Sequence, residues 1–312
     1  MQTFKKYFLI YLKGIGMGSA DVVPGVSGGT IAFITGIYET LLDAIKKVDL
    51  EALSLLKKFQ IKALWKHVNG SFLLPLFAGI GTSVISLASV IVGLLETYPI
   101  QVWSFFFGLI IISALIVLKS IKKWNIAVFL SIIIGGAIAY FIVSSTPAET
   151  PEGAWFLFIA GAVAICAMIL PGISGSFILL LFGKYEYVLS ALKEFRIVDI
   201  LIFATGCIVG ILSFSRLVSW LLKKYHQVTI GVLAGFMLGS LYKVWPWKET
   251  LKTFVDRHGE VKPLIEGNIF PDEYLAKTGD EPFFLQAVLF AAGGLLLVFV
   301  IDRIAALLNS EE

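Results

Sequence analysis

Hydrophobic residues in this sequence gather in long stretches that short polar loops separate. Six of the stretches approach the roughly 20 mostly apolar residues that a bilayer-spanning helix needs. They cover residues 72–95, 101–118, 125–143, 198–222, 228–244 and 283–308. The pattern predicts an all-α integral membrane protein, a helical bundle with about six full transmembrane spans.

Two further hydrophobic regions, residues 4–46 and 154–192, are interrupted by a proline followed by a glycine. The interruptions are Pro24-Gly25 and Pro171-Gly172. Proline lacks an amide hydrogen and clashes with the preceding helical turn, and glycine loosens the chain. Each region is therefore predicted to be two helices that meet at a break inside the membrane, as a re-entrant or a fully spanning hairpin.

The two breaks belong to an internal repeat. The segment V-V-P-G-V-S-G-G-T-I at 22–31 aligns with I-L-P-G-I-S-G-S-F-I at 169–178, an offset of 171 − 24 = 147 residues. Further matches at this offset, and weaker ones after a change of length, join Gly36, Tyr38 and Glu39 to Gly183, Tyr185 and Glu186, Gly108 to Gly235, and Gly135-Gly136 to Gly293-Gly294. We therefore predict two repeats, 1–146 and 147–312.

Lysine and arginine in short loops indicate which side of a membrane faces the cytoplasm. If each hairpin enters and leaves on one side, the lysine-rich loops and both termini share the cytoplasmic side. Of the opposite short loops, 96–100 and 144–153 have no Lys or Arg, and 193–197 has two. Segment 49–69 is then an amphipathic helix on the cytoplasmic surface, and 245–282 is a polar extracytoplasmic loop. Three spans separate the hairpins, so the repeats are inverted, as in transporters that expose one central site alternately.

Small polar residues follow each break and open a helix. They are Ser27, Gly28, Gly29 and Thr30 in the first repeat, and Ser174, Gly175 and Ser176 in the second. A helix N-terminus exposes unpaired amides and partial positive charge, and glycine lets an anion approach them closely. The pattern predicts a phosphate or carboxylate site, with a tight turn for close packing as the alternative.

Charged residues inside hydrophobic regions are energetically costly and often functional. Arg216 could bind a phosphate through two hydrogen bonds, or it could extend to the membrane surface. Asp21 could titrate and couple transport to protons, or it could cap a helix. Glu39 and Glu186 each follow the proline of their break by 15 residues. They are candidate gates or proton sites, with hydrogen bonds that anchor the hairpins as the alternative.

Composition narrows the function further. Charged residues make up 15% of the chain, against roughly 25% in soluble domains. The net charge of +3 gives no indication of a nucleic-acid partner. Cys166 and Cys207 lie in apolar runs and suit neither a disulfide framework nor a metal site. No metal or cofactor is predicted, and the oligomeric state is left open.

The segment G-S-A-D-V-V-P-G-V-S-G-G-T at 18–30, together with P-G-I-S-G-S at 171–176, resembles the bacterial polyprenyl-phosphate (undecaprenyl-phosphate) translocases. The resemblance covers nearly the whole chain. It implies a transporter in the bacterial plasma membrane that recycles undecaprenyl phosphate, the lipid carrier of cell-wall precursors, from the outer to the inner leaflet. The motif residues that carry over are Asp21, Pro24, Gly25, Ser27, Gly28, Gly29, Pro171, Gly172, Ser174 and Gly175.

Two other functions are compatible with broken helices. Membrane undecaprenyl-pyrophosphate phosphatases have a similar Pro-Gly-x-Ser-Arg-Ser-Gly motif, but Gly28 and Gly175 stand here in place of its arginine. The sequence also offers no glutamate cluster for a metal and no histidine within a hydrophobic region, so we predict that the protein is not an enzyme. A small-anion transporter or channel is the other alternative, and its cavity would be closed to lipid. A purely structural membrane protein would leave both breaks unexplained.

Overall fold

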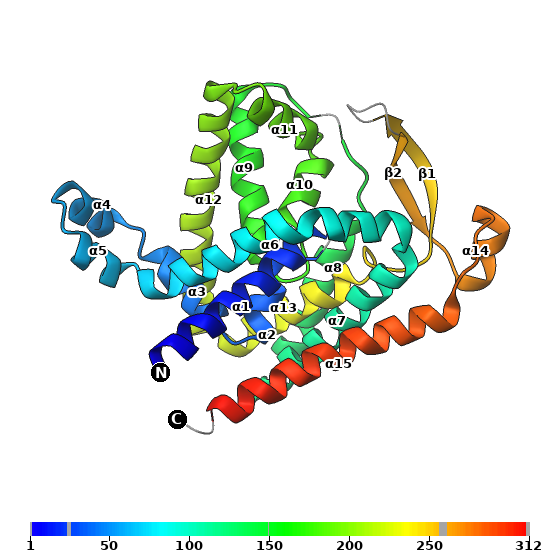
Figure 1. The fold of residues 1–312 in the computed structure, drawn as a ribbon, viewed down its shortest axis with the longest axis horizontal. Helices are drawn as coiled ribbons and strands as arrows, with labels where there is room; N and C mark the ends of the chain where they lie inside the picture. The colour runs from blue at the N-terminus through cyan, green and yellow to red at the C-terminus, as the bar shows by residue number, and fades with distance from the viewer. Residues whose placement is uncertain (1, 24–25, 149, 256–260, 310–312) are drawn as a thin grey trace.

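The computed structural model describes residues 2–23, 26–148, 150–255 and 261–309. The first part of the chain forms α1 (Gln2–Val22), α2 (Gly28–Ile34), α3 (Tyr38–Lys46), α4 (Leu50–Lys57), α5 (Ile61–His67), α6 (Gly70–Thr97), α7 (Pro99–Lys119) and α8 (Ile126–Ser144). The second part forms α9 (Ala154–Ile169), α10 (Gly175–Leu181), α11 (Tyr185–Lys193), α12 (Ile197–Lys224), α13 (His226–Ser240), β1 (Lys248–Val255), β2 (Val261–Asn268), α14 (Pro271–Thr278) and α15 (Phe284–Asn309). Figure 1 shows these elements along the chain.

Among the described residues, five helices are long and apolar enough to cross a bilayer, namely α6, α7, α8, α12 and the Phe284–Ile301 part of α15. They confirm five of the six predicted spans and make this a multi-pass membrane protein. The prediction for 228–244 was too long, because α13 ends at Ser240 after 15 residues. At about 1.5 Å per residue that is about 22 Å, short of the roughly 30 Å of a hydrocarbon core. The chain turns after Ser240, and Trp247 joins a separate buried cluster with Ile100 and Ile269.

Each broken hydrophobic region contains three helices where the sequence predicted two. The first break separates α1 from α2, and the second separates α9 from α10. An additional bend follows α2 at Gly36, with φ +71°, and follows α10 at Gly183, with φ +59°. The left-handed conformation of these glycines ends a helix at little steric cost. The chain changes direction sharply at the Gly183 bend, since α10 and α11 meet there at 108°.

Helix boundaries recur at fixed offsets along the chain. Both ends of α2 and α3 coincide with those of α10 and α11 after adding 175 − 28 = 147 residues. Both ends of α6 coincide with those of α12 after adding 197 − 70 = 127, and α8 begins 284 − 126 = 158 residues before α15. The offset falls by 147 − 127 = 20 where α4 and α5 occur only in the first part. It rises by 158 − 127 = 31 where β1, β2 and α14 occur only in the second.

The long helices pack in matching pairs, two within a part and two between the parts. Helix α1 lies along α6 and α9 lies along α12, whereas α7 lies along α15 and α8 along α13 (Figure 1). Glycines allow these close approaches: a Cβ atom on Gly108 of α7 would collide with the carbonyl of Ala291 on α15, and one on Gly235 of α13 would collide with the carbonyl of Ile132 on α8. Small residues at such contacts let membrane helices pack backbone to backbone. The last long helix of each part, α8 or α15, therefore packs against a helix of the other part.

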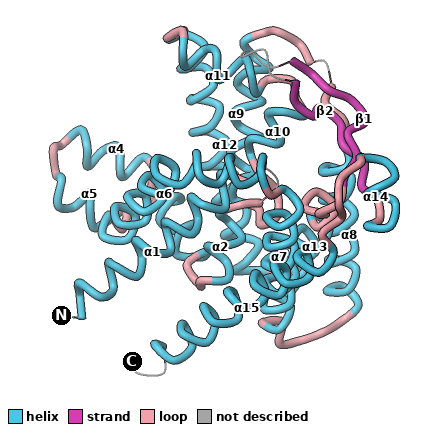
Figure 2. Tube along the Cα trace, turned by 45° about the vertical axis from the view of Figure 1, so that its right-hand side comes forward, coloured by secondary structure: helices cyan, strands magenta, loops and turns pink. Residues whose placement is uncertain are grey.

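Two segments differ from their predicted form. Residues 49–69 make two short helices, α4 and α5, instead of one, and they project from the body of the molecule (Figures 1 and 2). The chain reverses between them at Phe59, whose φ is +52°. The predicted polar loop 245–282 holds the antiparallel pair β1–β2 and helix α14. Its threonines, Thr250 and Thr253, are β-branched and favour strands.

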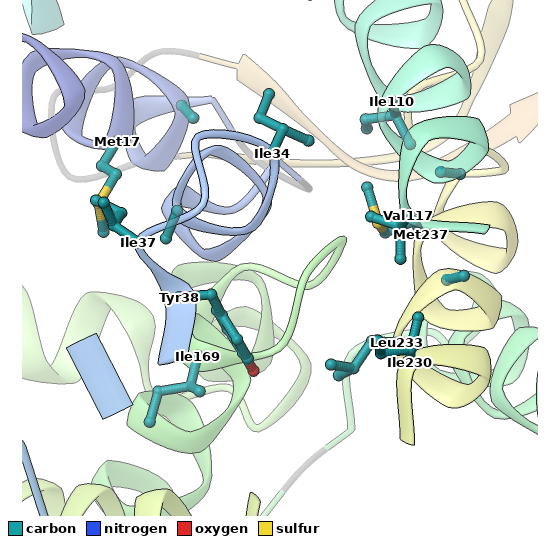
Figure 3. Close-up of a cluster of buried hydrophobic side chains, with 14 of the residues drawn as sticks. Met17, Ile34, Ile37, Tyr38, Ile110, Val117, Ile169, Ile230, Leu233 and Met237 are labelled. Atoms are coloured by element: carbon teal, nitrogen blue, oxygen red, sulfur yellow. The ribbon is translucent and has the colours of Figure 1, made fainter. Parts of the chain in front are cut away.

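A buried apolar core joins the parts around the short helices of the first hairpin. It includes Ile34 and Tyr38 from the first hairpin, Ile110 from α7, Ile169 beside the second break, and Leu233 from α13 (Figure 3). These residues come from both predicted repeats, so neither repeat has a core of its own at this place. The breaks lie next to this shared core.

Candidate functional site: the two helix breaks

The first break is capped by a carboxylate and a hydroxyl. The amide of Gly28 donates a hydrogen bond of 2.7 Å to Asp21 Oδ1, and the amide of Gly29 donates one of 3.0 Å to Ser27 Oγ. A Cβ atom at position 28 would lie 2.5 Å from Asp21 Oδ2, so glycine is needed for the carboxylate to come this close. Both acceptors satisfy exposed donors at the positive end of α2. Asp21 therefore makes the helix-capping contact that was one of its two interpretations.

The second break depends on a glycine in the left-handed conformation. Gly172 has a φ of +90°, and a Cβ atom there would lie 2.7 Å from Ser240 Oγ and 3.0 Å from the carbonyl of Phe236 on α13. Any larger residue would be strained and would clash. Beyond it, Ser174 Oγ lies 2.7 Å from Ser176 Oγ, and Ser174 makes no side-chain hydrogen bond to the backbone of α10.

The two breaks touch each other, although 141 to 142 residues separate the bonded positions. Ser27 Oγ donates a hydrogen bond of 3.0 Å to the carbonyl of Met168, and the amide of Gly172 donates one of 3.1 Å to Thr30 Oγ1. A Cβ atom on Gly29 would lie 2.6 Å from the carbonyl of Ile169, so the two backbones are nearly in contact. The structure thus brings the two predicted halves of the anion site together.

This junction is closed in the structure. Ser27 and Thr30 are 0% exposed and Ser174 is 4% exposed. The hydroxyls of Ser27 and Thr30, which the sequence offered as anion donors, instead bind the opposite break or their own helix. Pro171 is buried beside them, whereas Pro24 and Gly25 lie outside the described residues. A phosphate role for this junction stays a prediction, and it requires these contacts to open.

Arg216 lies in a different place from the breaks. It is exposed on α12, and its Nη1 donates a hydrogen bond of 3.3 Å to the carbonyl of Leu212. A surface cleft of about 490 Å³ is lined by Arg216 together with Lys46, Ser219, Trp220, Lys223 and Lys224. Sequence reasoning singled out Arg216 alone, because only the packing of α3 against α12 adds Lys46 to it.

Comparison with known proteins agrees with this architecture. Residues 17–262 match the family model described as VCA0040-like, undecaprenyl phosphate translocase-like. The chain belongs to this family. A polyprenyl-phosphate transporter of Vibrio cholerae serotype O1 is 48% identical over 299 residues, which cover 96% of this chain and 97% of that protein. A polyprenyl-phosphate transporter of Staphylococcus aureus is 33% identical over 264 residues, covering 79% and 88% of the two chains. No solved structure matches.

The translocase family confirms the resemblance seen in the sequence. Both breaks, and the helices α6 to α13 between and after them, fall within the matched range. The family description and the names of both relatives denote transport and not catalysis, so the protein is classed as a transporter and not as a phosphatase.

The paired glutamates of this translocase-like chain lie away from the breaks. Glu39 Oε1 is 3.6 Å from His226 Nε2 at the start of α13, and its side chain is largely exposed. Glu186 is half-buried on α11. Glu39 therefore lies within ion-pair distance of another helix, at a separation longer than a hydrogen bond, and anchoring, gating or proton transfer by either glutamate stays a prediction.

Two lysines near the helix bends escaped the sequence analysis. Lys13 Nζ donates a hydrogen bond of 2.8 Å to the carbonyl of Thr35 at the end of α2. Lys184 is buried at the start of α11, 5.7 Å from the ring centres of both Phe156 and Tyr187. A cation at a helix C-terminus offsets the partial negative charge there. The interruption of a hydrophobic run by Lys13 was the available signal, and for Lys184 it was its place between Gly183 and Tyr185.

Proposed function

We propose that this protein carries undecaprenyl phosphate from the outer to the inner leaflet of the bacterial plasma membrane, for reuse in cell-envelope synthesis. The observation that carries the proposal is the junction of the two breaks through Ser27–Met168 and Thr30–Gly172. It lies where two similar parts of a membrane protein meet. The names of the two relatives support polyprenyl phosphate as the cargo.

Alternating access follows if residues 1–146 and 147–312 are inverted repeats. The recurring helix boundaries and the matching packing pairs support the repeat. The lysine-rich loops support a cytoplasmic location for both termini. In such a protein, exchanging the conformations of the two repeats opens the same junction first to one side and then to the other.

The phosphate would bind at the opened junction, while the isoprenoid chain stays in lipid. Its oxygens would accept hydrogen bonds from the small residues after each break, Ser27, Gly28, Gly29, Thr30, Ser174, Gly175 and Ser176. Arg216 lies away from this junction and would engage the head group at a separate step, in the surface cleft. At present Asp21 occupies the amide of Gly28. An arriving phosphate must displace this carboxylate, because both anions need the same donor.

Asp21 would thereby link transport to protons. A charge-assisted hydrogen bond is roughly twice as strong as a neutral one, so protonation of Asp21 weakens its hold on Gly28. The freed amide then becomes available to the phosphate. Glu39 and Glu186 would act as gates near the outer ends of the two hairpins.

The test is reconstitution of the purified protein into liposomes with labelled undecaprenyl phosphate, following its exchange between leaflets. We expect exchange at least about tenfold faster than in protein-free liposomes, since uncatalysed passage must bring a phosphate charge through hydrocarbon. Exchange at the protein-free rate would contradict the proposal. Uptake of inorganic phosphate without lipid exchange would favour the small-anion alternative. Release of phosphate from undecaprenyl pyrophosphate would favour the enzyme.

A further inference from the structure

The cleft around Arg216 gathers cations from two elements. Lys46 comes from the end of α3, and Arg216, Lys223 and Lys224 come from the last turns of α12. Ser219 and Trp220 complete its lining. Helix α3 packs directly on α12, and Figure 1 shows it near one end of that helix.

Among the described residues, one carboxylate forms ion pairs with these cations, and it belongs to Asp43. Asp43 Oδ1 lies 3.0 Å from Lys46 Nζ, 3.9 Å from Lys223 Nζ and 3.2 Å from Ser219 Oγ. Arg216 and Lys224 have no acidic partner within the part of the chain that the structure describes. The guanidinium of Arg216 binds a backbone carbonyl, and Lys224 Nζ lies 5.3 Å from the ring centre of Trp220. The cleft therefore keeps a surplus of positive charge that suits an anion.

The cationic character is largely lost at the equivalent place in the other part of the chain. Subtracting the offset of 127 residues, Arg216, Lys223 and Lys224 correspond to Ser89, Glu96 and Thr97. Adding 147, Lys46 corresponds to Lys193. Of the four cations only one is retained, and an acid replaces another. The helices also differ, since α3 packs on α12 whereas the equivalent α11 does not pack along α6.

We infer that this cleft is a phosphate-monoester site that receives the head group of the lipid cargo at the lysine-rich end of the protein. Arg216 and Lys224 bind the phosphate oxygens, and Lys46 and Lys223 are shared with Asp43. A phosphate monoester carries a charge of about −1.5 to −2 at neutral pH. Four cations against the single carboxylate of Asp43 leave a positive surplus that this charge can neutralise. Trp220 and Tyr225 are half-exposed beside the cleft, as aromatic residues are at a membrane interface.

The inference rests on the proposed function for the identity of the cargo, but its chemistry is separate. A higher affinity for the phosphate at one end of the protein cannot by itself drive net transport. It increases the population of the state in which the phosphate occupies this end, by as much as the two ends differ in affinity. Asp43 is the internal competitor of the phosphate, because it contacts Lys46, Lys223 and Ser219 in this structure.

The experiment measures equilibrium binding to the full-length protein in lipid nanodiscs. The probes are undecaprenyl phosphate, phosphatidylglycerol and inorganic phosphate, each titrated separately. We expect Arg216→Gln with Lys224→Gln to weaken binding of undecaprenyl phosphate about tenfold or more, because two charge-assisted contacts are lost. Asp43→Asn should instead tighten binding about threefold or more, since it removes the competing charge but keeps a hydrogen-bonding group. Lys193→Gln, at the equivalent position, and Lys57→Gln with Lys58→Gln are controls that should stay within about twofold of the wild type.

The outcomes separate the possibilities. Unchanged affinity in the Arg216 and Lys224 variant, with a wild-type melting temperature, overturns the inference. An equal loss for phosphatidylglycerol also overturns it and assigns the cleft to ordinary anionic lipid, and a loss for inorganic phosphate alone assigns it to the free ion. Leaflet exchange is followed in parallel. Exchange by the wild type with no effect of the cleft variants defeats only this inference, whereas specific binding without any exchange defeats only the proposed function.

Discussion

The amide of Gly172 donates a hydrogen bond of 3.1 Å to the hydroxyl of Thr30, and this contact joins the two helix breaks. Gly172 cannot be replaced without a clash against α13, and Thr30 is fully buried. The contact therefore fixes the closed arrangement of the junction. Any motion that admits a phosphate between the breaks must first separate these two residues.

Replacing Thr30 with valine should destabilise the closed junction. Valine matches threonine in shape but leaves the buried amide of Gly172 without its acceptor, which costs about 1–3 kcal/mol. Thr30→Ser keeps the hydroxyl and is the matched control. Thermal unfolding in detergent measures the difference, and equal melting temperatures for the valine and serine variants would show that the bond does not hold the breaks together.

Asp21→Asn should retain the fold and remove the dependence of transport on pH. The asparagine oxygen can still accept the hydrogen bond from Gly28, but it cannot take up a proton in the relevant range. Leaflet exchange of undecaprenyl phosphate in liposomes, measured between pH 5 and 9 for wild type and variant, tests this. A variant whose pH profile parallels that of the wild type would exclude Asp21 as the titrating group. Glu39→Gln, which changes an exposed carboxylate, serves for comparison.

Helix α3 packs on α12, whereas the equivalent helices α11 and α6 do not pack along each other. This difference predicts contacts that form in a second conformation of the protein. Asp43 lies 3.9 Å from Lys223, and the equivalent residues are Ser190 and Glu96. If the repeats exchange conformations, these two residues should approach each other when the first pair separates. Cysteines at 190 and 96, joined by a short bifunctional thiol reagent after Cys166 and Cys207 are replaced with alanine, would detect this.

The control for that experiment is the pair Asp43→Cys and Lys223→Cys, which should cross-link in the state described here. Adding undecaprenyl phosphate should shift the yields of the two pairs in opposite directions. A protein that cross-links 43 to 223 but never 190 to 96, with or without lipid, would show that the second state does not form.

Gly108→Ala should destabilise the contact between α7 and α15. The added methyl group would collide with the carbonyl of Ala291, and overpacking of this kind typically costs about 1–3 kcal/mol. Gly81→Ala on α6 is the matched control, because a Cβ atom there meets no atom within 4 Å. The control should match or exceed the wild-type melting temperature, since alanine favours helix. A Gly108 variant as stable as the control would contradict the backbone-to-backbone contact.

The β1–β2 pair should loosen in acid. Burial by itself would raise the pKa of Glu266, but the charges of Lys248 and Lys243 outweigh it and lower that pKa below the ordinary 4.5. A lowered carboxyl pKa stabilises the folded form above the unfolded value, and this stability is lost as pH falls through the folded value. Amide-exchange protection of residues 248–255 and 261–268 should therefore decline below about pH 4.5. Glu266→Gln should remove this dependence, and an unchanged pH profile in that variant would assign the effect to other groups.

Much of the architecture could be predicted from local sequence signals. A hydrophobic run long enough to span a bilayer is self-sufficient, because its backbone bonds are satisfied within one helix. For this reason α6, α7, α8, α12 and α15 match their predicted ranges closely. The breaks were equally local, since Pro171 and Gly172 interrupt a helix by their own covalent structure. Hydropathy could not show that α13 stops at Ser240 or that residues 248–268 pair as strands.

The amino-acid sequence alone determined which segments are long and apolar enough to span a membrane, where the helices break and that the same short motifs recur in the two parts, because each of these depends on residues that are neighbours in the chain. Only the tertiary structure decided that α15 completes the first part and α8 the second, that Thr30 meets Gly172, and that Lys46 joins Arg216 in one cleft. Those contacts join residues about a hundred positions or more apart. They depend on how helix surfaces fit together, which hydropathy and motif spacing do not encode.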